Sequence, residues 1–412
     1  MNNPFLNKNR KFILEIENSL SEQYKEIDRI TELNDYKVIK SMQENQLSQA
    51  DFAWTTGYGY GDYGREKVEK IYSDIFHTED ALVRPSIASG THALYIIMSA
   101  ILKSGDELLS VSGKLYDTIQ KVIGLTGSEK GSLISKGIKY NEVDLKNNTF
   151  DYENIKKAIS NDTKLITIQR SIGYAHRKCH SIEEIEKLVK FIRSFNKEVI
   201  IMCDNCYGEF TRELEPSDVG VDIVGGSLIK NLGAGISIGG GYICGKKDLI
   251  EMCANRLTAP GLGKDLGLTF GTSRLTLQGL FYAPMVVANA LKSALIVGKT
   301  FENLGFEVFP KSDSKRNDIV QAIILENEDN VIKFCREIQK AGTVNSHVTP
   351  YPWDMPGYED QVIMASSGFI DGSSIELSAD APLRQPYIVF YQGGISYNQV
   401  KFALINMMDH FL

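Results

Sequence analysis

The fold that we expect for this chain is decided by two segments, residues 200–210 (IIMCDNCYGEF) and residues 222–241 (DIVGGSLIKNLGAGISIGGG). Each begins as an apolar strand, and a charged side chain follows each strand, Asp204 in the first segment and Lys230 in the second. A buried charge is costly unless it has a partner, so an acid and a lysine at neighbouring strand ends indicate a functional site. A structural ion pair in the core is the alternative interpretation.

Strands and helices are expected to alternate from residue 81 to residue 227. This predicts an α/β fold with a mostly parallel sheet and helices on both faces. Such sheets bind ligands at the carboxyl ends of their strands. Polar segments follow five of the predicted strands: Ser89, Gly90 and Thr91; Tyr116; Gln169, Arg170 and Ser171; Asp204 and Tyr207; Ser227 and Lys230. All five segments are therefore expected at one edge of one sheet.

The segment Ser89-Gly90-Thr91 precedes a helix that is apolar on nearly every side. The first turn of a helix offers free backbone N–H groups and the positive end of the helix dipole, which together suit a phosphate group. An ordinary N-cap is the alternative, because Ser and Thr cap many helices that bind nothing.

Length and composition bound the protein class. The chain has 412 residues, 43% of them hydrophobic and 24% charged, as expected for a soluble globular protein with two or three structural units. We divide it into a helical segment (1–50), a large domain (51–290) and a smaller C-terminal α/β domain (291–412).

Charge and apolar patterning address location and partners. The net charge of −7 argues against binding to nucleic acid or to an anionic membrane. The N-terminus lacks the apolar core of a secretory signal, and no apolar run reaches the ~20 residues that span a bilayer. Six dispersed cysteines fit a reducing compartment. We expect a cytoplasmic protein.

Two further motifs could be taken for other kinds of site. Cys203 and Cys206 form a C-x-x-C pair across the end of a strand, which favours burial over metal or redox chemistry. The glycine-rich run 233–241 leads into a strand-like segment, whereas a dinucleotide-binding loop would lead into a helix. We expect no metal site.

The motifs SGTHAL (89–94), DNCY (204–207) and SLIK (227–230) resemble those of fold-type-I pyridoxal-phosphate enzymes. Four further segments narrow the resemblance: DYGREKVEKIY, IQRS, GSLIKNLGAG and QGGIS. With them the chain resembles the cystathionine β-lyase/methionine γ-lyase-like family of aluminium-resistance proteins. The resemblance extends from about residue 50 to the end of the chain. The chain departs from the family pattern at Ile172, where arginine is usual.

The resemblance implies that the cofactor is pyridoxal 5′-phosphate. Lys230 would hold its aldehyde and later move the substrate proton, which requires a depressed pKa. Asp204 would pair with the pyridine nitrogen, Tyr207 with the ring hydroxyl, and Tyr116 would stack on the ring. The phosphate would be held by Ser89, Gly90, Thr91 and Ser227.

The resemblance also implies a shared active site in a homodimer or homotetramer. The loop YGYGDYGR (58–65) offers Tyr58, Tyr60, Tyr63 and Arg65 to the partner subunit's site, and Tyr58 is the favoured catalytic residue. Arg384 would bind the substrate carboxylate, since a planar guanidinium matches a carboxylate with two hydrogen bonds. An ordinary surface arginine is the alternative interpretation of Arg384.

The predicted function is that of a carbon–sulfur lyase. It would cleave a sulfur amino acid, cystathionine or methionine-like, by β- or γ-elimination to a thiol, a 2-keto acid and ammonia. One alternative is an aminotransferase of the same fold, which would depend on a second keto acid. Another, from a different class, is a non-enzymatic metal-resistance protein, which would bind metal stoichiometrically without the cofactor.

Overall fold

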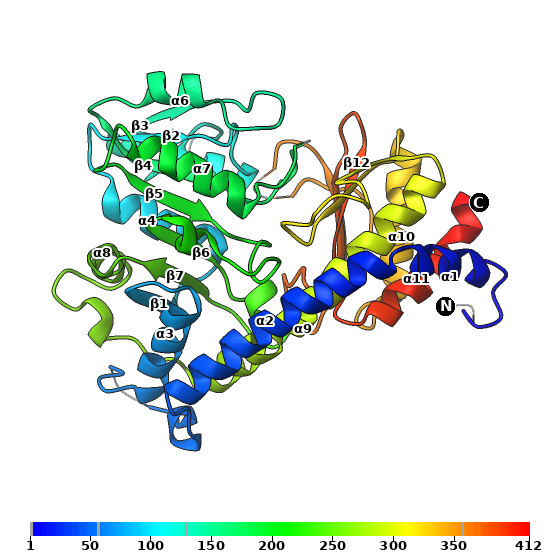
Figure 1. The fold of residues 1–412 in the computed structure, drawn as a ribbon, viewed down its shortest axis with the longest axis horizontal. Coiled ribbons are helices and arrows are strands. Elements are labelled where there is room, and N and C mark those ends of the chain that lie inside the picture. Colours follow the sequence, from blue (N-terminus) through cyan, green and yellow to red (C-terminus); the bar gives the residue numbers. More distant parts are fainter. Residues whose placement is uncertain (1–2, 56–57, 128–129, 176, 356–357) are drawn as a thin grey trace.

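The computed structural model describes residues 3–55, 58–127, 130–175, 177–355 and 358–412. Two sheets lie at opposite ends of the molecule, and the long helix α9 (Ser273–Asn303) connects them (Figure 1). The two sheets face a shared region in which the candidate site lies.

The larger sheet has seven strands in the order β1-β7-β6-β5-β4-β2-β3. Strand β7 pairs antiparallel with both of its neighbours, and the other pairs are parallel. The carboxyl ends of the remaining strands therefore meet at one edge, which confirms the predicted mostly parallel sheet. The strands are β1 (Asp80–Arg84), β2 (Glu107–Ser110), β3 (Lys139–Glu142), β4 (Thr163–Gln169), β5 (Ile200–Asp204), β6 (Ile223–Ser227) and β7 (Gly241–Gly245).

Helices cover both faces of this sheet because strand side chains alternate between two apolar cores. Met202 packs in the core under one group of helices, whereas Ile201 and Cys203 pack in the core under the other. The first group is α4 (Gly90–Ile101), α5 (Asp117–Ile123) and α8 (Lys247–Leu257); the second is α3 (Tyr63–Ile75), α6 (Tyr152–Ala158) and α7 (Ile182–Arg193).

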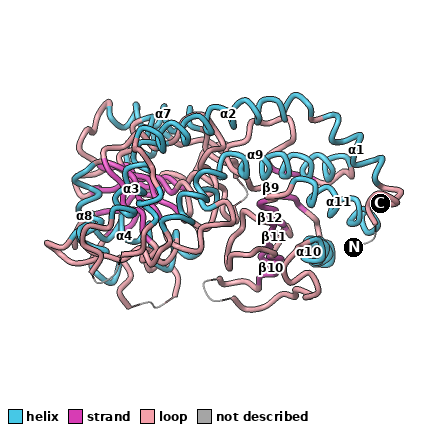
Figure 2. Tube along the Cα trace, turned by 90° about the horizontal axis from the view of Figure 1, so that it is seen from below, coloured by secondary structure: helices cyan, strands magenta, loops and turns pink. Residues whose placement is uncertain are grey.

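The N-terminal segment forms α1 (Arg10–Ser19) and α2 (Ser21–Glu44). Figures 1 and 2 both show α2 lying along α9. Helix α9 is long and apolar enough to cross a membrane, but 72% of its apolar window is buried inside the protein. It therefore serves as a core helix here. The predicted domain boundary at residue 290 falls within it.

The smaller sheet is antiparallel throughout, in the order β10-β11-β12-β9-β8. One of its faces packs on α9, α10 (Glu328–Ala341) and α11 (Tyr397–Phe411), and the other faces the larger domain. The strands are β8 (Glu307–Phe309), β9 (Gln321–Ile324), β10 (Val362–Ser366), β11 (Leu377–Pro382) and β12 (Ile388–Gly393). Short 3₁₀ helices are η1 (Gln49–Phe52), η2 (Ile134–Lys136), η3 (Pro216–Val219), η4 (Asn231–Gly233) and η5 (Gly263–Asp265).

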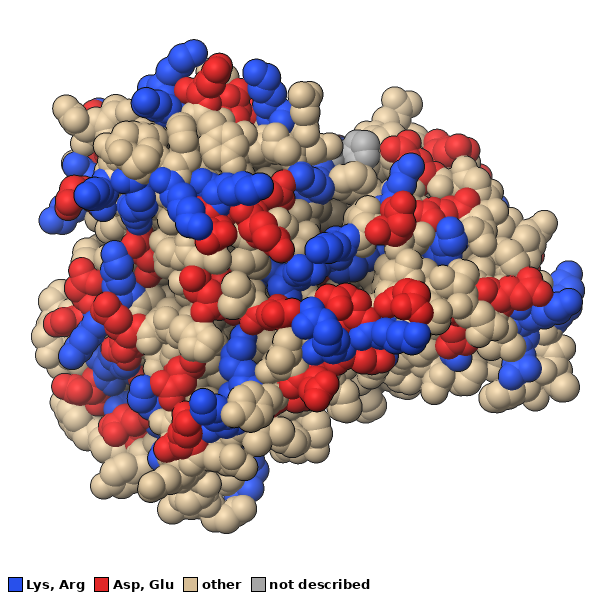
Figure 3. All heavy atoms as spheres, in the orientation of Figure 1, with Lys and Arg blue, Asp and Glu red and all other residues tan. Residues whose placement is uncertain are grey.

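The surface carries both signs of charge. On the face drawn in Figure 3, lysine and arginine side chains are interspersed with aspartate and glutamate, and acidic residues exceed basic ones over the whole chain by 52 to 45.

Candidate active site

A cavity lies where the carboxyl edge of the larger sheet meets the smaller domain. Its wall combines residues that follow β4, β5 and β6 with residues of the smaller sheet. The lining residues are Tyr116, Gln169, Ser171, Gly173, Tyr174, Asp204, Cys206, Tyr207, Lys230, Val320, Asp380 and Gln392. Four of the residues that the sequence predicts for the site therefore meet in one cavity: Lys230, Asp204, Tyr207 and Tyr116.

Lys230 lies on a tight turn just after β6. The turn needs glycine at position 233, because a Cβ there would lie 1.8 Å from the Leu228 carbonyl oxygen. The next residue, Asn231, donates from Nδ2 to the Glu209 carbonyl oxygen at 2.9 Å, and this bond ties the turn to the segment after β5. The Lys230 Nζ lies 4.0 Å from the centroid of the Tyr207 ring.

Charges around Lys230 decide its protonation. Burial by itself lowers the pKa of Lys230, but Cys206, Tyr207 and Asp204 outweigh burial and raise the pKa above its ordinary value. The chain alone therefore holds an ammonium group here, which differs from the depressed pKa that proton transfer requires.

Asp204 ends β5 and reaches the same cavity. Its Oδ1 accepts a hydrogen bond from the Cys206 backbone N–H at 3.1 Å. Burial raises the pKa of Asp204, and the nearby Lys230 ammonium opposes that rise. This carboxyl group is thus placed where a positively charged partner stabilises its ionised form.

Tyr207 connects the two domains at the cavity. Its backbone has a φ of +70°, in the left-handed region that few non-glycine residues adopt, and this turns the side chain into the cavity. Its hydroxyl lies 2.8 Å from the Ser374 hydroxyl in the segment before β11. A group bound beside Tyr207 would therefore contact both domains.

The segment 89–91 and Ser227 lie beside the cavity wall. Ser89 caps α4, since its Oγ accepts from the His92 backbone N–H at 3.1 Å. A Cβ on Gly90 would lie 3.2 Å from the Cβ of Ser227 and 3.4 Å from the Sγ of Cys206, which lines the cavity. The first turn of α4 thus meets the end of β6, and Thr91 bonds the Thr118 hydroxyl at 3.0 Å.

Tyr116 is fixed at its backbone and at its ring. Its N–H donates to the Gln169 Oε1 at 2.7 Å, and its hydroxyl lies 2.7 Å from the Tyr358 hydroxyl. The ring centroid is 5.4 Å from that of Tyr174. Stacking of Tyr116 on a cofactor ring stays a prediction, and the structure holds the side chain in the cavity wall where such stacking would occur.

A family model described as methionine γ-lyase matches residues 9–412. The chain belongs to this family. A solved structure from Listeria monocytogenes, described provisionally as a cystathionine β-lyase involved in aluminium resistance, is 42% identical with a TM-score of 0.95, covering 97% of this chain and 99% of that one. A carbon–sulfur lyase involved in aluminium resistance from Clostridium novyi is 44% identical with a TM-score of 0.93, covering 98% and 96%.

A more distant structure bears on the fold. An O-acetylhomoserine (thiol)-lyase from Campylobacter jejuni, described provisionally as such, contains a pyridoxyl-lysine phosphate group. It is 16% identical with a TM-score of 0.59, covering 86% of this chain and 88% of that chain. The fold-type-I architecture and the family predicted from the sequence are confirmed.

Besides Ser89, Gly90, Thr91 and Ser227, which lie beside the cavity wall, two further predicted residues are absent from it. Tyr58 is 76% exposed, and the adjacent residues 56 and 57 lie outside the described part of the chain. Arg384 is 47% exposed, and its Nη1 lies 2.8 Å from Asp360 Oδ2. It lines a second depression, which shares Tyr174 with the cavity. One subunit alone does not bring either side chain to Lys230, and their roles in partner and substrate contacts stay predictions.

The smaller sheet supplies Asp380 and Gln392 to the cavity wall, and neither residue was predicted from the sequence. Asp380 lies in β11, where its neighbours Ala379 and Ala381 are buried. A carboxylate inside an apolar strand was the signal that singled out Asp204, and it could have singled out Asp380. Its partner Gln392 gives no comparable signal in YIVFYQGG.

A second missed acid is Glu209, two residues after Tyr207. Its Oε1 accepts from the Tyr242 hydroxyl at 2.7 Å, and its Oε2 has no partner among the described residues. Burial raises the pKa of Glu209 to about 8, while the Tyr242 hydrogen bond opposes the rise. The turn that carries Tyr207 therefore contains a carboxyl group that is protonated at neutral pH.

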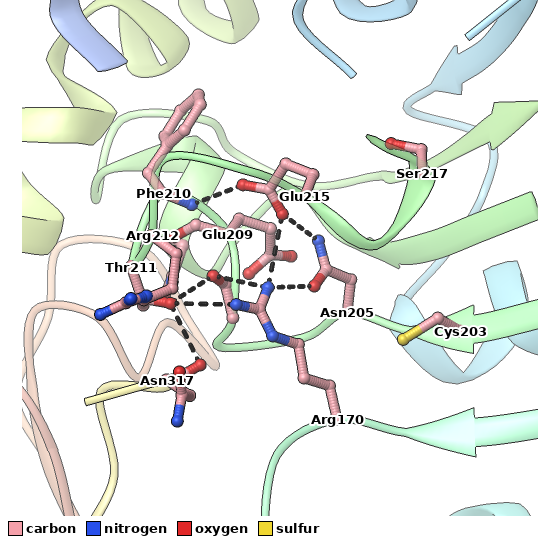
Figure 4. A network of polar contacts seen from close by, with 12 residues as sticks. Arg170, Cys203, Asn205, Glu209, Phe210, Thr211, Arg212, Glu215, Ser217 and Asn317 are labelled. Atoms are coloured by element: carbon pink, nitrogen blue, oxygen red, sulfur yellow. Dashed lines mark hydrogen bonds and ion pairs between the residues drawn. The ribbon is translucent and has the colours of Figure 1, made fainter. Parts of the chain in front are cut away.

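Arg170 points into a polar network (Figure 4). It is absent from the cavity lining, although its neighbours Gln169 and Ser171 belong to that lining. Its Nη1 donates to Asn205 Oδ1 at 2.8 Å and to the Gly208 carbonyl at 3.0 Å, and lies 3.4 Å from Glu215 Oε2. Glu215 in turn accepts from the Phe210 N–H at 2.8 Å. The network therefore holds the turn 205–210 in place through Arg170 and Glu215.

The thiols and acids do not gather into a metal site in the part of the chain that the structure describes. No group of three or more His, Cys, Asp or Glu residues there could hold an ion. The six cysteines are free and buried, and Cys203 and Cys206 form no disulfide.

Proposed function

We propose that the protein is a pyridoxal-phosphate-dependent carbon–sulfur lyase. It would act on a sulfur amino acid and release a thiol, a 2-keto acid and ammonia. The observation that supports this most is the meeting of Lys230, Asp204 and Tyr207 in one cavity, at the ends of β5 and β6, in a chain of the methionine γ-lyase family.

The side chains at the cavity suit each part of this cofactor. Lys230 supplies the amine that its aldehyde needs, and Asp204 supplies a buried carboxylate for a protonated ring nitrogen. The first turn of α4, with Ser227 packed against Gly90, supplies free N–H groups and hydroxyls for its phosphate. When bound, the cofactor acts as an electron sink that acidifies the Cα–H bond of an amino acid.

The residues of the chain would then position groups and move protons. As a free amine, Lys230 would take the Cα proton and return it at a neighbouring atom. Asp204 would keep the ring nitrogen protonated. Tyr207, held by Ser374, would hydrogen-bond the ring hydroxyl, and Tyr116 would cover one ring face.

We propose further that the active site is shared between subunits of a homodimer or homotetramer. Exposed aromatic side chains gather around the loop of Tyr58, and monomers rarely expose such clusters. The cluster consists of Trp54 (64% exposed), Tyr58 (76%), Tyr60 (64%), Tyr63 (72%) and Phe270 (56%). A partner that covers it would receive Tyr58, and Arg384 would bind the substrate carboxylate. Free buried cysteines fit a cytoplasmic location.

The test is the visible spectrum of the purified protein with pyridoxal phosphate, before and after borohydride. We expect a yellow band that borohydride abolishes and that Lys230→Ala lacks. Lys139→Ala, which changes an exposed lysine paired with Asp162, is the matched control and should keep the band. A protein that stays colourless with added cofactor would refute the proposal.

Product analysis separates the lyase from the aminotransferase. We expect the wild-type protein to release ammonia and a 2-keto acid from cystathionine or methionine without any second keto acid. A strict requirement for a second keto acid would identify an aminotransferase instead.

A further inference from the structure

Asp380 and Gln392 form one polar wall of the cavity, opposite the strand ends that carry Asp204 and Lys230. Strands β11 and β12 pair antiparallel with Asp380 opposite Phe390, so Gln392, two residues further, lies on the same face of the sheet. Gln392 Nε2 donates to Asp380 Oδ2 at 3.0 Å. This fixes the orientation of both side chains toward the cavity.

Oxygen atoms on this wall lack partners. Gln392 is 3% exposed, and its Oε1 accepts no hydrogen bond from any described residue. The Tyr174 hydroxyl also lines the cavity and is buried, and no residue in the same part of the chain donates a hydrogen bond to it. Because buried polar atoms are nearly always hydrogen-bonded, these oxygens indicate that a bound group donates to them.

The charge on this wall is negative. Burial raises the pKa of Asp380 to about 6, with Gln392, Tyr174 and Lys230 opposing the rise, so the carboxylate is ionised at neutral pH. Lys230 is the only lysine or arginine among the described lining residues. When Lys230 holds the cofactor, its free ammonium group would no longer lower the pKa of Asp380, and a cation bound at this wall would restore that stabilisation of the carboxylate.

We propose that Asp380, with the oxygens of Gln392 and Tyr174, binds a second ammonium group of the substrate, on the part that leaves as the thiol. The substrate class is then a thioether amino acid with two amino groups, as in cystathionine, and methionine-like substrates with one amino group are poor substrates. The α-amino group cannot be the one bound here, because it must reach the cofactor at Lys230. This inference rests on the proposed lyase function.

The test compares cystathionine with two analogues that lack one of its amino groups, S-(3-carboxypropyl)cysteine and S-(2-carboxyethyl)homocysteine. The first analogue keeps the cysteine half of cystathionine, which reacts in β-elimination. The second keeps the homocysteine half, which reacts in γ-elimination. We expect the wild-type holoenzyme to prefer cystathionine by at least tenfold in kcat/KM. Asp380→Asn, which keeps the shape and removes the charge, should lower kcat/KM for cystathionine roughly ten- to a hundredfold, mainly through KM.

The analogues supply the internal control. With them, Asp380→Asn should change kcat/KM less than threefold, and its cofactor spectrum should match the wild type. Asp371→Asn, an exposed acid of the same domain, should leave both substrates unaffected. Equal losses with cystathionine and with the analogues would overturn the inference, because they would assign Asp380 a general structural role.

The wild-type enzyme alone distinguishes the two proposals. If it cleaves cystathionine and the reactive analogue equally well, the second ammonium site is refuted and the lyase function stands. If it shows the borohydride-sensitive band but cleaves none of these compounds nor methionine, the lyase function is refuted together with the inference.

Discussion

Arg170 and Lys230 follow strands of the same sheet at the same edge, but their surroundings differ. Arg170 is fully buried and meets Asn205, Gly208 and Glu215, so its charge is compensated within the chain (Figure 4). Lys230 Nζ makes no hydrogen bond to any described residue and lies over the Tyr207 ring. Similar positions thus serve two purposes: a hydrogen-bonded cation braces the fold, and a cation without hydrogen bonds is available to a ligand.

The largest expected effect is the loss of stability on replacing Arg170, the cation that is paired within the chain. Arg170→Ala should lower the free energy of unfolding by about 3–5 kcal/mol, because it leaves the Glu215 carboxylate buried without its cation. Denaturant unfolding of the cofactor-free protein measures this difference. The matched control is Arg29→Ala, which breaks a pair with Glu213 whose side chains are 50% and 46% exposed.

We expect the Arg29 variant to lose less than about 1 kcal/mol, since exposed pairs contribute little. A similarly small loss for Arg170→Ala would show that the network in Figure 4 does not brace the turn, and the comparison would fail.

A smaller and pH-dependent effect is expected at Glu209, which lies between the two regions. Its pKa is about 8 in the folded chain against an ordinary 4.5. Between these values the unfolded chain has lost the proton that the folded chain keeps, so Glu209 lowers stability progressively as pH rises to about 8. Glu209→Gln should remove this penalty, and its stability advantage should grow by roughly 1 kcal/mol per pH unit from pH 6 to pH 8.

Unfolding of both proteins at several pH values tests this prediction, with the exposed Glu198→Gln as the control that should show no such trend. A stability difference that is constant with pH would mean that Glu209 is ionised in the folded chain.

The smallest stability effect is expected at Arg384. Its ion pair with Asp360 is 47% and 37% exposed, so Arg384→Ala should cost less than about 1 kcal/mol of unfolding free energy. The same variant tests the predicted carboxylate contact, which requires KM for the substrate to rise at least about tenfold. An unchanged KM would leave Arg384 as a surface residue and remove that role.

The half of the site on the larger domain could be predicted from the sequence for a simple reason. Parallel strands joined by helices place their carboxyl ends at one edge of the sheet. Asp204, Tyr207 and Lys230 lie at or just after the ends of β5 and β6, so they meet at that edge. Gln169 lines the cavity and Arg170 does not, because successive side chains point in opposite directions at the end of β4. Predicting which of the two faces the cavity requires the register of β4 in the sheet.

The other half could not be predicted, because antiparallel strands of a second sheet supply it. Asp380 and Gln392 are twelve positions apart and meet only through the pairing of β11 with β12. Tyr58 and Arg384 were singled out by motif, and their distance from Lys230 within one subunit depends on loop packing that no local pattern records.

The sequence by itself determined the α/β class, the family and the convergence of Lys230 and Asp204, because these depend on strand ends and on short motifs. The tertiary structure decided which polar groups are paired and which face the cavity unpaired. That distinction depends on the packing of the smaller sheet against the larger one, since the hydrogen-bond partners of a buried atom come from segments distant in the chain.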